Sequence, residues 1–227
     1  MFRDFYHAFY YSLLIAASLS CLFLFRHAQK PFRLLAALTV LTLLSELIAK
    51  YVAFVLHRPN NIVYYFFTPV EFFFYVLIYK QFFSNKKWNY ILWICFAFFV
   101  LAEILNTIFY QPLSVTNTNI FLLESILLII FSLNLFIKIR ESAYYENLLK
   151  EGVFWFNSAV LFYYAFSILV WGFHSIKVYY LKNPPLFIYN FLLIFSGLLY
   201  AIYAFAVGIN SITSKKSQSY KWINFYR

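Results

Sequence analysis

Five ionisable side chains lie inside long apolar stretches of this sequence: Glu46, Lys50, Glu71, Glu103 and Glu124. Each stretch is long enough to cross a lipid bilayer. An ionisable group at that depth costs about 2.5–3.5 kcal/mol on insertion scales, and residues that carry such a cost commonly mark a functional site. These groups are therefore the first candidates for binding a ligand, a metal ion or a proton.

Helical spacing predicts which of these side chains share a face. Glu46 and Lys50 are four residues apart, so they lie on one side of their helix. Tyr64 and Glu71 are seven residues apart, which places them on one side of the following helix. The residues that we expect to line a polar pocket in the outer half of the membrane are Glu46, Lys50, Glu71, Glu103, Glu124, Tyr64, Asn106 and Asn157.

A purely structural interpretation of the same residues stays open. Glu46 could pair with Lys50, and the other glutamates could hydrogen-bond to tyrosine, asparagine and serine side chains where helices meet. In that case the polar groups would fasten the helices together and bind nothing.

Histidines suggest a second alternative. His7, His57 and His174 are predicted near the outer membrane face, where a carboxylate from Glu103 or Glu124 could join them. Histidine nitrogen and carboxylate oxygen are ligands that zinc accepts. A metal-dependent intramembrane hydrolase is therefore a candidate, although the sequence has no HExxH motif.

The composition indicates a membrane protein. Hydrophobic residues make up 64% of the 227 residues and charged residues 11%, with a mean hydropathy of +0.73. Soluble domains carry about a quarter charged residues. The net charge of +10 would favour nucleic acid in a soluble protein. Here the basic residues lie between apolar runs and suit anionic lipid headgroups, so lipid and not nucleic acid is the expected partner.

Seven apolar runs predict an all-α bundle of seven transmembrane helices over residues 1–210, followed by a basic cytoplasmic tail over 211–227. The runs lack the short strict alternation of barrel strands. Proline, asparagine and charged residues separate them and end the helices. The predicted spans are 6–25, 34–56, 62–79, 90–110, 120–137, 153–173 and 186–208.

The distribution of lysine and arginine predicts the orientation. Thirteen of the 18 basic residues lie in the first, third and fifth connections and in the tail, and four lie on the opposite side. Cytoplasmic loops are enriched in lysine and arginine. We therefore expect the N-terminus outside, the C-terminus in the cytoplasm, and a multi-pass location in the inner (plasma) membrane.

Several seven-helix functions lack the residues that they need. A retinal protein requires a lysine in its last helix, and the run over 186–208 has none. Carriers built from two related halves show an internal repeat and paired helix breaks. We find no such repeat, and only the span over 62–79 has an internal proline, Pro69. No cofactor is expected, apart from zinc if the hydrolase alternative holds.

Two stretches carry a resemblance. The segment Asn61-Ile-Val-Tyr-Tyr-Phe-Phe-Thr-Pro-Val-Glu71-Phe-Phe73 resembles the third helix of small, uncharacterised bacterial seven-helix membrane proteins, and Phe154-Trp-Phe-Asn157 resembles the start of their sixth. The resemblance implies interest in Glu71 but no activity. Their layout is similar to that of membrane sensor modules, which is a likeness of architecture only.

Together these observations favour a non-enzymatic sensory or signalling-accessory module with a polar pocket in the outer half of the bundle. The short basic connections would offer a surface to a cytoplasmic or membrane signalling partner. The metal-dependent hydrolase and a small proton-coupled transporter, with glutamates as proton sites, are the alternatives.

Overall fold

The computed structural model describes residues 2–83, 85–141, 148–180 and 186–216, with side chains described over 5–83, 85–141, 148–173 and 190–213. It consists of seven α-helices and two short 3₁₀ turns, η1 (Phe25–His27) and η2 (Leu148–Lys150). The helices are α1 (Phe2–Leu24), α2 (Lys30–Phe54), α3 (Asn61–Phe82), α4 (Lys86–Phe109), α5 (Thr118–Glu141), α6 (Gly152–Tyr180) and α7 (Leu186–Lys216).

Each of the seven helices is long and apolar enough to cross a membrane, so the predicted seven-helix, multi-pass architecture is confirmed. Most helices continue past the predicted apolar span. α5 ends at Glu141 and α7 at Lys216, so the first residues of the expected tail prolong the last helix. Polar residues can continue a helix into the headgroup region, where water can satisfy its end. Asn85 caps α4 by accepting a hydrogen bond from the Lys87 amide at 3.0 Å.

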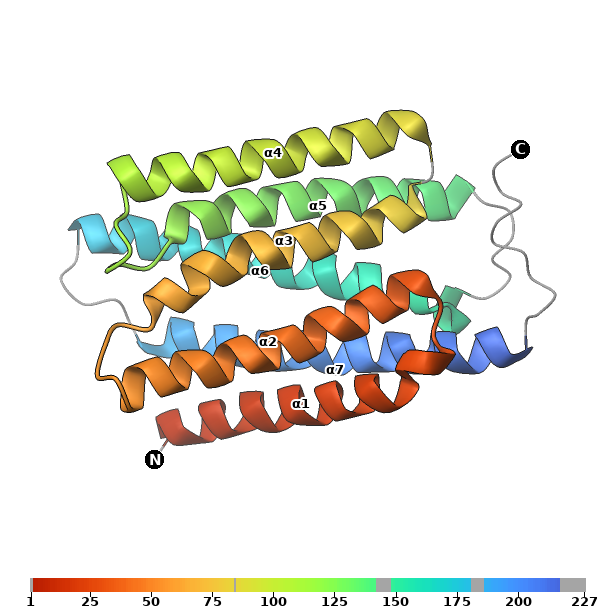
Figure 1. Ribbon diagram of the computed structural model, residues 1–227, viewed down its shortest axis with the longest axis horizontal. Helices are drawn as coiled ribbons and strands as arrows, with labels where there is room; N and C mark the ends of the chain where they lie inside the picture. Colours follow the sequence, from red (N-terminus) through yellow and green to blue (C-terminus); the bar gives the residue numbers. More distant parts are fainter. Residues whose placement is uncertain (1, 84, 142–147, 181–185, 217–227) are drawn as a thin grey trace.

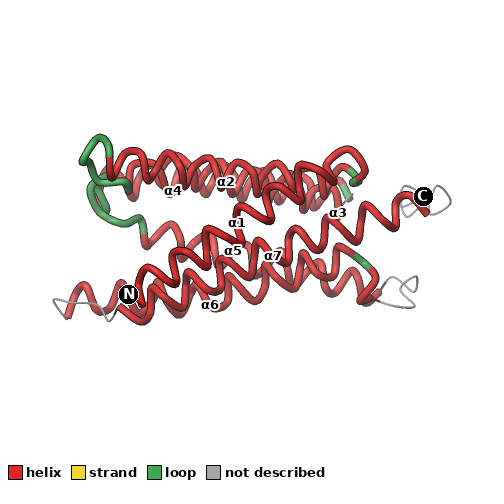
Figure 2. The backbone as a smooth tube through the Cα atoms, turned by 90° about the horizontal axis from the view of Figure 1, so that it is seen from below, coloured by secondary structure: helices red, strands yellow, loops and turns green. Residues whose placement is uncertain are grey.

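Helices that follow one another in the chain are neighbours in space, and α7 packs against α1 to close the ring. Further contacts between α2 and α7, and between α3 and α5, cross the interior. α2 and α4 lie in one layer and α6 and α7 in the other (Figure 2). The N-terminus, the α2–α3 turn and the α4–α5 loop share one end of the bundle, which we call the N-terminal end (Figure 1). The α1–α2 and α3–α4 connections lie at the opposite, C-terminal end.

Large apolar and aromatic side chains fill the middle of the bundle. The fully buried residues of this layer, which we call the floor layer, come from six helices and are Leu14, Leu38, Phe72, Tyr75, Leu128, Val160 and Tyr203, each at most 1% exposed. The phenol oxygens of Tyr75 and Tyr203 lie 2.6 Å apart. A layer packed this closely separates the interior near the N-terminal end from the C-terminal end.

Candidate ligand-binding cavity

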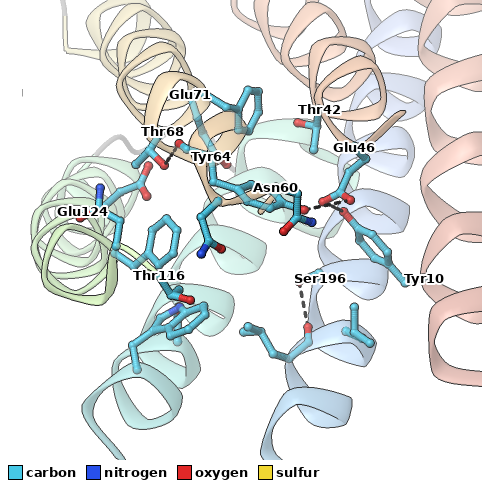
Figure 3. A pocket seen from close by; sticks show the side chains of 18 of the residues that line it. Tyr10, Thr42, Glu46, Asn60, Tyr64, Thr68, Glu71, Thr116, Glu124 and Ser196 are labelled. Carbon is cyan, nitrogen blue, oxygen red and sulfur yellow. Dashed lines mark hydrogen bonds between the residues drawn. The ribbon is translucent and has the colours of Figure 1, made fainter. Parts of the chain in front are cut away.

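A cavity of about 710 Å³ occupies the half of the bundle nearer the N-terminal end. Its walls come from every described helix except α4, and its rim from the α2–α3 turn and the α4–α5 loop (Figure 3). The ionisable side chains that line it are His7, Glu46, Lys50, Glu71 and Glu124, together with the tyrosines Tyr10, Tyr11, Tyr64, Tyr163, Tyr164 and Tyr200. Its volume falls within the range of about 300–1,000 Å³ that small-molecule sites have.

The Glu46 carboxylate is held by three phenols. Tyr10 donates to Oε1 at 3.1 Å, and Tyr11 and Tyr64 donate to Oε2 at 2.9 and 3.3 Å. The donors come from α1 and α3, so this one side chain on α2 joins three helices. A hydrogen bond to a charged group contributes about 1.5–3 kcal/mol, which makes this cluster a structural element of one cavity wall.

Lys50 does not make the ion pair with Glu46 that the structural interpretation invoked; none is found between them in the described part of the chain. Its ammonium instead lies over the ring of Tyr11, with Nζ 3.3 Å from the centroid. This is a cation–π contact, in which the ring's electron-rich face attracts the charge. The cavity therefore already holds one cation by an aromatic face.

Glu71 and Glu124 form part of the opposite side of the cavity and are much less well satisfied. The Tyr164 hydroxyl donates to Glu71 Oε1 at a long 3.4 Å. Glu124 is only 4% exposed, and its Oε1 has no hydrogen-bond partner among the described residues. The side chain reaches from α5 toward Thr68 of α3 (Figure 3). A buried polar atom without a partner costs about 1–3 kcal/mol, so this arrangement needs an explanation.

Glu103 lies outside the cavity and fastens the loop over residues 110–117, which we call the rim loop. The Glu103 side chain is 6% exposed, and its Oε1 accepts a hydrogen bond from Asn117 Nδ2 at 3.2 Å. Asn117 in turn lines the cavity. Glu103, which we expected to line the pocket, therefore contacts a residue that lines the cavity and does not line it itself.

Asn106 also belongs to this loop support and does not line the cavity. Its Nδ2 donates to Asn117 Oδ1 at 2.8 Å and to Gln111 Oε1 at 3.1 Å, and its Oδ1 accepts from Asn119 Nδ2 at 2.9 Å. The Tyr65 hydroxyl ties the loop to α3 by donating to the Gln111 carbonyl at 2.7 Å. A buried network whose members are all paired holds its backbone in one conformation.

Asn157 is the third expected pocket residue that does not line the cavity. It lies nearer the C-terminal end of the bundle, close to the start of α6. Its Oδ1 accepts from the Tyr79 hydroxyl at 3.1 Å and its Nδ2 donates to the Ser132 carbonyl at 2.9 Å. The side chain is fully buried, and these bonds join α3, α5 and α6. Its polarity serves helix packing.

The structure describes the side chains of two of the three histidines. His7 lines the cavity and stacks on Tyr11, with ring centroids 6.5 Å apart. His57 is exposed in the α2–α3 turn, where its φ of 49° lies in the left-handed region. The side chain of His174 lies outside the described residues. Across the described side chains, no group of three His, Cys, Asp or Glu residues could hold a metal ion.

Sequence reasoning missed most of the tyrosines of the cavity. Tyr10, Tyr11, Tyr163 and Tyr200 all line it. Tyr10 and Tyr200 are both buried, and their ring centroids lie 6.3 Å apart. The available signal was helical spacing. Tyr200 follows Ser196 by four residues, so these two polar side chains share a face of their helix, as Glu46 and Lys50 do.

Comparisons with protein families, with curated proteins and with solved structures find no match for this chain.

Proposed function

We propose that the protein is a non-enzymatic membrane module that binds a small polar ligand in the cavity at its N-terminal end and serves sensing or signalling. The observation that carries this proposal is the cavity itself, with the nearly buried Glu124 carboxyl on its wall. A few polar groups that converge in an otherwise aromatic and apolar pocket are typical of ligand sites.

The closely packed floor layer favours a protein that binds a ligand over one that transports a ligand through the bundle. Tyr75 and Tyr203 are fully buried directly below Glu71 and Tyr200, one helical turn further along α3 and α7. Their hydroxyls bond each other, and the large side chains of the floor layer pack around them. Carboxyl groups at membrane depth are also what a proton-coupled carrier uses. Transport would require this layer to separate, whereas binding requires no such movement.

The orientation predicted from charge completes the proposal. It places the mouth of the cavity outside the inner membrane and the basic connections in the cytoplasm. A ligand would then enter from outside, while the exposed basic residues Lys86 and Lys87 at the start of α4 would face lipid headgroups or a signalling partner.

A panel of small organic cations, anions and neutral polyols tests the binding. Thermal unfolding of the purified protein in detergent would be compared with that of Ala53→Trp, which fills the mouth of the cavity, and of Leu101→Trp on α4, whose side chain is 55% exposed. We expect one class of compound to raise the melting temperature of the native protein and Leu101→Trp but not of Ala53→Trp. A panel that leaves all three proteins unchanged would contradict a ligand site here.

Flux measurements distinguish the proposed binding module from a transporter. The stabilising compound would be added outside vesicles that contain the native protein, with and without a proton gradient. We expect binding without accumulation inside. Gradient-driven uptake that Ala53→Trp abolishes would replace the sensory proposal with transport.

A further inference from the structure

The two sides of the cavity differ in how fully their carboxyl groups are satisfied. Glu46 accepts three phenol hydrogen bonds, whereas Glu71 accepts one long bond and Glu124 Oε1 accepts none from the described residues. We call the side formed by Glu71, Glu124 and the neighbouring rings Phe121, Tyr163, Tyr164 and Trp171 the acceptor wall; all of these residues line the cavity. The carboxyl oxygens of this wall can therefore accept further hydrogen bonds from a ligand that carries donors.

The charge of the cavity indicates which donor fits. Three carboxyl groups and one lysine ammonium line it among the described residues, and that ammonium is held by the Tyr11 ring on the other side. An anionic ligand would lie among carboxyl groups and be repelled. A primary ammonium offers three N–H donors and a positive charge, and charge-assisted bonds to a carboxylate are about twice as strong as neutral ones.

The aromatic rings of the acceptor wall favour the same ligand. Phe121 and Trp171 lie with ring centroids 5.0 Å apart, and Tyr163 and Tyr164 meet edge to face, also at 5.0 Å. Ring faces attract cations, and aromatic cages are a common means of binding organic ammonium groups. The Lys50–Tyr11 contact, 3.3 Å from ammonium to centroid, shows this chemistry already in use within the cavity.

We infer that the ligand is a small organic amine whose ammonium binds between Glu71 and Glu124 and whose apolar body packs on the rings of the acceptor wall. This inference rests on the proposed ligand-binding function and adds the chemical class. The cavity, at about 710 Å³, has room for an amine with an aromatic or branched aliphatic body.

Three probes of one shape test the inference: phenethylammonium, the neutral 2-phenylethanol and the anionic 3-phenylpropionate. Their affinities would be measured by thermal shift and calorimetry in detergent at constant ionic strength. The proteins compared would be the native chain, Glu124→Gln, and Glu151→Gln, a partly buried carboxyl at the opposite end of the bundle. We expect phenethylammonium to bind the native chain and Glu151→Gln equally. Glu124→Gln should weaken it about 10- to 100-fold, as expected for one charge-assisted bond.

Three outcomes overturn the inference in different ways. If 2-phenylethanol or 3-phenylpropionate binds as tightly as the amine, and Ala53→Trp still abolishes that binding, the cavity is a ligand site but not for amines. If none of the three probes binds the native chain, the amine class is wrong. If Glu124→Gln has native stability and binds the amine with unchanged affinity, Glu124 is not the partner of the ammonium group.

Discussion

The phenol oxygens of Tyr75 on α3 and Tyr203 on α7 lie 2.6 Å apart in the middle of the bundle, where neither side chain is exposed. α3 and α7 belong to distant parts of the sequence, and this bond joins them directly beneath the cavity. A short hydrogen bond in a dry interior helps to fix the relative position of two helices, because breaking it deprives each hydroxyl of a buried partner.

Replacing Tyr75 with phenylalanine should therefore destabilise the protein. The substitution keeps the ring but leaves the Tyr203 hydroxyl without this partner, which costs about 1–3 kcal/mol. The double variant Tyr75→Phe/Tyr203→Phe should lose less than the sum of the two single variants, because it leaves no orphaned hydroxyl. Thermal unfolding in detergent measures both. Strictly additive losses would show that the hydroxyls do not interact.

The Glu46 cluster gives a second stability prediction. Tyr11→Phe removes the shortest of the three bonds to the carboxylate, 2.9 Å, while the ring that faces Lys50 stays in place. We expect a loss of about 1–2 kcal/mol. Tyr51→Phe is the matched control, since this tyrosine is 55% exposed on the same helix as Glu46. Equal melting temperatures for Tyr11→Phe and Tyr51→Phe would contradict the role of the cluster.

The seven helices were predictable because each depends on a local property, an apolar run bounded by polar residues. The residues at which the helices begin and end were harder to predict. The run over 120–137 ends where apolar residues end, yet α5 continues through Lys138 and Arg140 to Glu141, since backbone hydrogen bonding does not stop at the edge of the hydrocarbon.

The cavity was only partly predictable for a different reason. Helices that are apolar on all sides do not reveal their rotation, so the sequence could not decide whether Tyr163 or Phe162 faces inward; the structure places Tyr163 in the cavity and leaves Phe162 62% exposed. Glu103 looked equivalent to Glu124, yet the rim loop folds back over it. That fold depends on contacts from Tyr65 and Asn117, which spacing along one helix cannot show.

The rim loop should loosen when its central side chain is removed. Asn106→Ala eliminates bonds to Gln111, Asn117 and Asn119 at once, and leaves their polar atoms partly unpaired. We expect at least 2 kcal/mol of destabilisation, about the cost of one or two buried groups without partners. Amide hydrogen exchange over 110–117 should become faster. Tyr110→Ala, which removes a 77% exposed side chain at the start of the same loop, should leave exchange over 111–117 unchanged.

The predicted orientation can be checked by labelling. In a chain with Cys21 and Cys95 replaced by serine, single cysteines at Arg58 and Lys86 would report on opposite ends of the bundle; both positions are exposed. A membrane-impermeant maleimide added to intact cells should label Arg58→Cys and not Lys86→Cys. Labelling of Lys86→Cys alone would show that the orientation is the reverse of the predicted one. The mouth of the cavity would then face the cytoplasm.

The close approach of α6 and α7 predicts opposite effects of one substitution at two glycines. A Cβ added at Gly152, at the start of α6, would lie 2.6 Å from the Ala206 carbonyl oxygen and 3.0 Å from the ring of Phe32. A backbone carbonyl cannot move away without shifting α7, so Gly152→Ala should destabilise by about 1–3 kcal/mol through overpacking. Gly172, in the same helix, has nothing within 4 Å of the added carbon.

Gly172→Ala should therefore be neutral or stabilising by up to about 1 kcal/mol, the difference in helix propensity between the two residues. Thermal unfolding of the two variants side by side provides the measurement, and each serves as the other's control for a change of glycine to alanine in α6. Equal shifts in both would mean that α6 and α7 do not approach closely at Gly152. Because Tyr203 and Ala206 lie one turn apart on α7, a displacement at Gly152 would also reach the floor layer, so Gly152→Ala should weaken amine binding in the cavity as well.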